Sequence, residues 1–186
     1  MWSSRDVALI ITFAVLTFIN FAVVLQTFTL LTGITGIGYG VDLFGAIIAT
    51  VGFLLFKGKR WRISVLGLLI YFLSLPLYLG GGSINVITRI PIILKNFIID
   101  VVFNSFYEYF EKRDKLIWLA IGQSVYFFMT SPFISILFFS LFVPFGTLAP
   151  LLNLVILMLP LILGVSLAGG YIGYEIYKRL EKIPYL

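Results

Sequence analysis

The chain has 186 residues, of which 61% are hydrophobic and only 11% are charged, and its mean hydropathy is +1.11. Soluble proteins carry about 25% charged residues, so this composition excludes a soluble domain and predicts a polytopic membrane protein, whose net charge of +5 indicates topology and not nucleic-acid binding. The sequence contains neither Cys nor His, which excludes disulfides, thiol chemistry, His-ligated metals and Ser-His catalysis, and no cofactor is expected.

The first predicted membrane span covers residues 7–31, which is long enough to cross about 30 Å of hydrocarbon. The segment before it, Met1–Arg5, is too short and too weakly basic to open a cleaved signal peptide. We therefore expect this helix to remain in the protein. Asn20 interrupts the span, and an amide at that depth favours an interhelical hydrogen bond over solute binding.

A glycine-rich loop, Thr32–Gly40, separates the first span from the second, which is predicted over residues 41–56. Tyr39 in this loop is a candidate solute contact, because a loop of glycine and tyrosine can fold over a ligand. Asp42 lies in the first turn of the second span, where the helix dipole favours a carboxylate. We expect Asp42 to cap this helix in preference to binding solute.

The densest basic cluster, Lys57–Arg62, follows the second span, and a third span is predicted over residues 63–79. A second glycine-rich loop comes next and includes Asn85. Arg89 lies at the membrane surface, where it would meet an anionic group or a lipid phosphate. The fourth span, predicted over residues 91–110, begins with a proline, which suits the first helical position because its missing N–H costs nothing there.

The fourth span carries charge in its interior, which distinguishes it from the other spans. A charge such as Lys95 or Asp100 costs on the order of 2.5–3.5 kcal/mol in a bilayer, so these residues usually face a cavity or a partner helix. At about 100° per residue, Asn96 and Asp100 share one face, and Lys95 points about a third of a turn away. Two interpretations stay open: a structural ion pair or interhelical hydrogen bond, and the polar wall of a solute site.

The apolar run Leu116–Phe145 is too long for one perpendicular helix, since about 30 residues would extend roughly 45 Å. A break is therefore expected at Ser131–Pro132, because a proline removes a backbone bond and restricts the residue before it. The fifth span is predicted over residues 116–143. Gln123 lies at about the same depth as Asp100, so we expect these two side chains to be able to face one another.

The sixth span is predicted over residues 151–177, with an internal proline, Pro160, that would kink it. Its inner half contains small residues four positions apart. This spacing lets helix backbones approach closely, either within the bundle or against another subunit. The small pairs are Gly164 with Ala168 and Gly169 with Gly173.

Topology follows from the distribution of basic residues, which are enriched on the cytoplasmic side of membrane proteins. With both termini inside, 11 of the 13 basic residues are cytoplasmic, and only Arg89 and Lys95 lie elsewhere. The sequence therefore predicts an all-α, multi-pass protein of the cell membrane. Its single domain, residues 1–186, would have six transmembrane helices and both termini in the cytoplasm.

Three stretches resemble the substrate-binding S component of energy-coupling-factor (ECF) transporters. They are the opening Arg5–Ile10, the charged span and inner loop Lys95–Leu116, and the glycine-rich final helix Gly169–Leu180 with its basic exit. The resemblance implies capture of a vitamin or metal ion from the outer face, and partnership with a membrane coupling subunit and two ATPases. The absence of His argues against the metal-ion branch, and no GxxxxGK[ST] sequence is present to bind nucleotide.

If the resemblance holds, the solute binds between the outer loops and the outer halves of the last three helices. There, Arg89 or Lys95 would meet an acidic group, Asp100 a donor or cation, and aromatic side chains would stack on a ring. The candidate solute contacts are Tyr39, Asn85, Arg89, Lys95, Asn96, Asp100, Gln123, Tyr126 and Asn153.

Two other function classes compete with the transporter interpretation. A membrane enzyme is disfavoured, because the eight carboxylates are dispersed and no paired acidic motif stands near a Ser or Lys. A non-transporting scaffold or accessory subunit of a larger membrane complex remains the alternative. It predicts that the purified protein binds no small molecule, whereas the ECF interpretation predicts that a vitamin-sized molecule is retained through purification.

Overall fold

A computed structural model of the chain describes residues 2–25, 27, 42–75 and 90–183. Every element in these ranges is a helix. Two of them, η1 and η2, are π-helical segments that continue the α-helix before them. The elements are α1 (Ser4–Asn20), η1 (Phe21–Leu25), α4 (Leu43–Leu55), α5 (Arg62–Ser74), α7 (Ile90–Ile98), η2 (Ile99–Phe103), α8 (Asn104–Glu111), α9 (Leu116–Phe139) and α10 (Phe145–Leu180).

Within the described ranges, four helices are long and apolar enough to cross a membrane. Two shorter apolar helices, α4 and α5, accompany them. The predicted all-α membrane architecture is therefore confirmed to this extent. The candidate spans are Ser4–Val24, Ile90–Glu111, Leu116–Phe139 and Phe145–Leu180.

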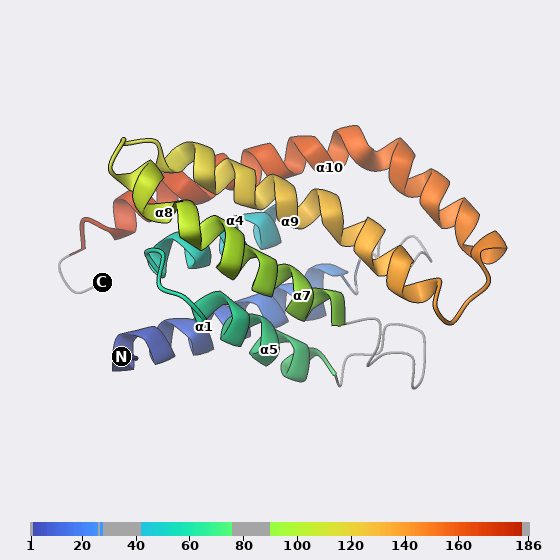
Figure 1. Ribbon diagram of the computed structural model, residues 1–186, viewed down its shortest axis with the longest axis horizontal. Coiled ribbons are helices and arrows are strands. Elements are labelled where there is room, and N and C mark those ends of the chain that lie inside the picture. The colour runs from blue at the N-terminus through green and yellow to red at the C-terminus, as the bar shows by residue number, and fades with distance from the viewer. Residues whose placement is uncertain (1, 26, 28–41, 76–89, 184–186) are drawn as a thin grey trace.

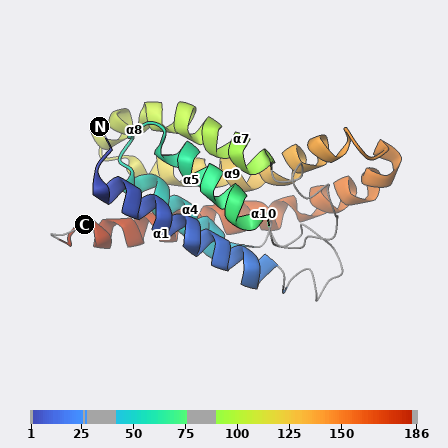
Figure 2. The same ribbon diagram turned by 90° about the horizontal axis from the view of Figure 1, so that it is seen from below.

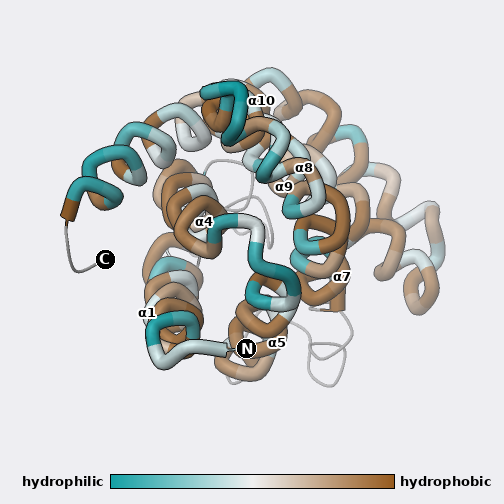
Figure 3. The backbone as a smooth tube through the Cα atoms, turned by 60° about the vertical axis from the view of Figure 1, so that its left-hand side comes forward, coloured by the Kyte–Doolittle hydropathy of each residue, from teal (hydrophilic) through white to brown (hydrophobic). Residues whose placement is uncertain are grey.

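The helices run between two ends of an elongated bundle (Figure 1). Helix α1 begins, and α10 ends, at the same end of the molecule, where the α4–α5 and α8–α9 connections also lie. Helices α9 and α10 pack along each other and project beyond the other helices at the opposite end, in both views (Figures 1 and 2). Figure 3 shows hydrophilic residues gathered at the end that holds the two termini, and predominantly apolar helices behind it.

At the end of the bundle that holds the two termini, a buried carboxylate, Asp6, links separate parts of the chain. This side chain completes a capping box with Ser3 at the start of α1. It also accepts from Lys59 Nζ at 2.9 Å and Arg62 Nη2 at 3.1 Å. Because Lys59 and Arg62 belong to the α4–α5 connection and the start of α5, this one carboxylate ties two distant parts of the chain together.

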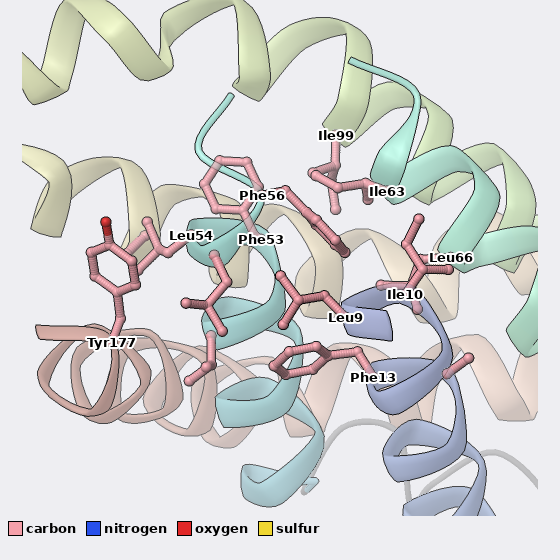
Figure 4. Close-up of a cluster of buried hydrophobic side chains, with 14 of the residues drawn as sticks. Leu9, Ile10, Phe13, Phe53, Leu54, Phe56, Ile63, Leu66, Ile99 and Tyr177 are labelled. Carbon is pink, nitrogen blue, oxygen red and sulfur yellow. The ribbon is translucent and has the colours of Figure 1, made fainter. Parts of the chain in front are cut away.

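The core lies among α1, α4, α5 and the α7–α8 helix, with contributions from α9 and α10 (Figure 4). Phe13 from α1 and Phe53 from α4 belong to it, and the ring of Phe53 packs edge-on against Tyr107 at a centroid distance of 6.4 Å. Tyr107 in turn shares a hydrogen bond of 3.3 Å between hydroxyl groups with Tyr177 of α10. Aromatic side chains therefore connect α4, α8 and α10.

Helix α10 approaches its neighbours through glycines. A Cβ atom added at Gly169 would lie 2.3 Å from the Cβ of Ala46 on α4, and one at Gly173 would lie 2.7 Å from the Cβ of Thr50. A Cβ atom added at Gly164, by contrast, would contact no neighbouring helix within 4 Å. The spacing of Gly169 and Gly173 thus serves packing within the bundle, which was one of the two alternatives that the sequence left open.

The predicted break at Ser131–Pro132 is wrong. Helix α9 continues through Pro132 to Phe139, because a single missing backbone bond does not end a helix that is packed along its length against α10. Helix α10 likewise contains both Pro150 and Pro160, and it starts at Phe145, six residues before the predicted boundary at residue 151. Figure 1 shows α10 curved along its length.

Candidate functional site

A cavity lies among α1, α4, α5, α7 and α9. Its wall is mostly apolar, with phenylalanines from three of these helices, and its polar lining residues are Thr17, Asp42, Asn96 and Gln123. The free volume is about 40 Å³. Since one water molecule needs roughly 10–15 Å³ measured in this way, the cavity accommodates a few waters or a small polar group.

Gln123 contributes the most unusual polar group of this cavity. Its side chain comes from the second turn of α9 and is only 2% exposed. The Oε1 atom has no hydrogen-bond partner in the described part of the chain. Buried polar atoms are nearly always hydrogen-bonded, and leaving one unpaired costs about 1–3 kcal/mol. The amide is therefore available to a molecule inside the cavity.

Asn96 reaches the same cavity from α7. Its Nδ2 donates to the carbonyl of Ile92 at 2.8 Å. Its Cβ packs so closely on α5 that a Cβ atom added at Gly67 would lie 2.6 Å away. Asn96 is thus positioned by its own helix and by α5. The structure brings two of the predicted site residues, Asn96 and Gln123, to one cavity.

Asp42 lines the cavity from the start of α4, but its carboxylate is already engaged. One oxygen accepts from the backbone N–H of Gly45 at 2.7 Å, which caps the helix as the sequence predicted. The other oxygen accepts from Nδ2 of Asn20 on α1. The amide of Asn20 therefore makes the interhelical hydrogen bond expected of it.

Lys95 is buried beside the cavity and points towards α9. Its side chain is 2% exposed, and Nζ donates to the hydroxyl of Ser131. The ammonium also lies 4.3 Å from the ring centroid of Phe127, which is one of the cavity-lining residues. Lys95 and Asp100 form no ion pair with each other. Each makes interhelical hydrogen bonds instead, Lys95 to α9 and Asp100 to the start of α5, which is the other form of the structural alternative for the fourth span.

Asp100 lies at the first turn of η2 and binds the start of α5. Its carboxylate accepts from the backbone N–H groups of Trp61 and Ser64, at 2.9 and 2.7 Å. It also accepts from the hydroxyl of Ser64 at 2.8 Å and from Nδ2 of Asn104 at 2.8 Å. Trp61 precedes α5 with φ of 70° and no side-chain cap of its own. Asp100 therefore replaces the missing N-cap from a neighbouring helix.

This arrangement differs from the predicted encounter between Asp100 and Gln123. All the hydrogen-bond partners of Asp100 lie in η2–α8 and at the start of α5, and Gln123 is not among them. Asp100 also does not line the cavity. Equal depth was insufficient to predict the pairing, because the free backbone N–H groups at the start of α5 lie closer to the carboxylate than the α9 amide does.

The remaining candidates lie elsewhere. The ring of Tyr126 is half-buried and packs on Phe103 at a centroid distance of 5.4 Å. Asn153 is exposed on α10. Tyr39, Asn85 and Arg89 lie outside the described residues.

The sequence did not identify the apolar wall of the cavity. Phe127 and Phe128 are the clearest examples, since both line it from α9. Nothing distinguishes these phenylalanines from the many others in the apolar spans, because their role depends on which helices pack together. Among the described residues, no group of three or more acidic, His or Cys side chains is placed to hold a metal ion.

Comparisons with protein-family models, with curated proteins and with solved structures give no match to this chain.

Proposed function

We propose that this chain is the membrane-embedded solute-binding S component of an ECF-type transporter that takes up a vitamin or related micronutrient. The observation that carries the proposal is the buried side-chain oxygen of Gln123, a cavity-lining residue, which has no hydrogen-bond partner among the described residues. A bundle that served only as a membrane scaffold would gain stability from an apolar residue there, because an unsatisfied buried amide is destabilising. The membrane coupling subunit and the ATPases would supply the energy for transport.

The proposal includes six spans with both termini in the cytoplasm. It is supported by the arrangement of the described helices, because the start of α1, the end of α10 and the two basic connections lie at one end (Figures 1 and 3). Basic connections of this kind favour the cytoplasmic side. The shorter helices α4 and α5 have 13 residues each and belong to the predicted spans 41–56 and 63–79.

The cavity lining supports a ring-containing solute with hydrogen-bonding groups. Phenylalanines would stack on the ring, while Asn96 and Gln123 would bond its polar groups. A vitamin-sized molecule is larger than the free volume of about 40 Å³, so binding would require the lining side chains to move apart. Such adjustments are common when a protein binds a ligand.

Mass spectrometry of an extract of the purified protein tests this proposal. We expect a vitamin-sized molecule in the wild-type extract. In Gln123→Leu the amount retained should fall at least tenfold, equivalent to about 1.4 kcal/mol or more of binding free energy. The fold should survive this substitution, since it removes an unpaired polar atom and adds no charge.

A matched control is available on α10. Asn153→Leu also replaces an amide by an apolar side chain, but at an exposed position away from the cavity. This variant should retain as much solute as the wild type. Absence of any retained molecule from the wild-type extract, or equal retention by Gln123→Leu, would contradict the proposed function.

The second candidate is a non-transporting scaffold or accessory subunit. The observation that favours it is the wide apolar exposure of α10. Leu157 is 78% exposed, and only 11% of the most apolar 18-residue stretch of this helix is buried. The same extract separates the two functions, because a scaffold would retain no small molecule. Lipid covers such a surface equally well in a membrane, so this exposure weighs less than the unpaired amide of Gln123.

A further inference from the structure

The ammonium group of Lys95 lacks an anionic partner within the described residues. The ion pairs there are formed by Lys57, Lys59, Arg62 and Lys112. An ammonium carries three N–H donors, yet Lys95 has one hydroxyl acceptor, that of Ser131, and one aromatic ring, that of Phe127. The hydroxyl of Ser131 itself donates to the carbonyl of Phe127 at 2.6 Å.

These contacts do not compensate a charge buried to this depth. Lys95 is 2% exposed and lies in the first half of a candidate membrane span, Ile90–Glu111. An uncompensated buried charge is strongly destabilising, whereas a cation–π contact and one neutral hydrogen bond offset only part of that loss. An anion that arrives from outside the chain would supply the missing compensation.

Lys95 lies next to residues that line the cavity. On α7, Ile92 precedes it by three residues and Asn96 follows it directly, and both line the cavity. The ring of Phe127 lines the cavity and also contacts the ammonium. Asp42, the carboxyl-bearing residue of the lining, already has two hydrogen-bond donors. Lys95 is therefore the basic group directly behind this wall, in contact with one of its lining rings, that an anion would neutralise.

We propose that the solute of this cavity carries a carboxylate, and that Lys95 and Ser131 form the subsite that binds it. A single buried cation matches a monoanion, whereas a phosphate monoester carries about −1.5 to −2 charges at pH 7. The carboxylate would accept from Lys95 Nζ, which Ser131 Oγ holds in place by accepting from it, and the amides of Asn96 and Gln123 would bond other parts of the molecule. This inference rests on the proposed solute-binding function.

The test uses acetate as a probe of the subsite, because it is small enough for the cavity. Thermal unfolding of the purified full-length protein in detergent is followed with acetate and with acetamide, which has the same shape and no charge. Acetate should raise the Tm of the wild type more than acetamide does at the same concentration. We call the difference between these two Tm shifts the acetate excess. In Lys95→Met the acetate excess should disappear, equivalent to at least tenfold weaker acetate binding.

Lys57→Met is the matched control. Lys57 is a half-exposed lysine that pairs with Glu181 at 3.0 Å, so removing its charge should leave the acetate excess unchanged. Lys95→Gln provides a second variant that keeps a polar group of similar length, and it too should lose the excess. Without any probe, both Lys95 variants should unfold at or above the wild-type Tm, because a buried charge has been removed.

The subsite is refuted if acetate shows no excess over acetamide in the wild type, or if the same excess persists in both Lys95 variants. This failure is distinguishable from failure of the proposed function. If the wild type and Lys95→Met retain the same molecule in their extracts, and Gln123→Leu loses it, the protein binds a solute but not through an anionic group. If no molecule is found in the wild type, the proposed function itself fails.

Discussion

Replacing Asp100 by leucine is expected to lower the free energy of unfolding by about 3–5 kcal/mol, because several hydrogen bonds to a charged group are lost together and each contributes about 1.5–3 kcal/mol. The carboxylate accepts from four donors, on Trp61, Ser64 and Asn104. Leucine would remove this acceptor from the backbone N–H groups of Trp61 and Ser64 and from the Ser64 hydroxyl, and Nδ2 of Asn104 would keep only its 3.4 Å contact with the carbonyl of Lys59. Helix α5 would lose the only N-terminal cap that the described residues provide. Thermal or chemical unfolding in detergent measures the loss.

Two further variants separate the cap from a general effect of removing charge. Asp100→Asn keeps one accepting oxygen, so its loss should be smaller, about 1–3 kcal/mol. Glu108→Leu removes a carboxylate from the same continuous helix, but Glu108 is exposed and pairs only with Lys112 at 3.5 Å. Its loss should stay within about 0.5 kcal/mol. Equal effects of Asp100→Leu and Glu108→Leu would show that Asp100 does not support α5.

The second large effect is expected at Gly169. An alanine Cβ at this position would lie 2.3 Å from the Cβ of Ala46 and 3.3 Å from the backbone of that residue. Neither of these atoms belongs to a flexible side-chain end, so α4 and α10 must move apart. Overpacking of this kind costs about 1–3 kcal/mol, and Gly169→Val should cost more. The measurement is again the unfolding free energy or Tm in detergent.

Gly164 provides the control on the same helix. Nothing lies within 4 Å of an added Cβ there, and alanine is favoured over glycine in a helix interior by about 0.5–1 kcal/mol. Gly164→Ala should therefore be neutral or slightly stabilising. The double variant Ala46→Gly with Gly169→Ala should recover much of the loss, because it exchanges the two groups across one contact. Additive losses in the double variant would contradict a direct contact.

Several features of the fourth span could be predicted from spacing alone. Asn96 and Asp100 share the face that packs on α5, and Lys95 points away from it towards α9. The cap by Asp42 was also predictable, because it depends on the helix dipole and on a residue three positions along the same chain. These predictions concern geometry within one helix, which the period of 3.6 residues determines.

The partners of the buried polar groups were not predictable. Asp100 was expected to be able to face Gln123, yet it binds the start of α5, and Gln123 stays unpaired at the cavity. The period of a helix says which residues share a face, but not which neighbouring helix covers that face. Pro132 shows the same limit, since packing along α10 keeps α9 continuous through a residue that disrupts isolated helices.

The sequence by itself determined that this protein is built of apolar helices and that its basic residues, apart from Lys95, lie at or near the ends of the apolar runs. Both properties follow from local composition, because transfer into a membrane depends on each side chain and on the length of each apolar run. The tertiary structure alone decided that Asn96 and Gln123 meet at one cavity, that Lys95 contacts one of its lining rings and that Asp100 supports α5. These outcomes depend on which helices pack together, since a buried polar group bonds with the donors or acceptors that packing brings within reach.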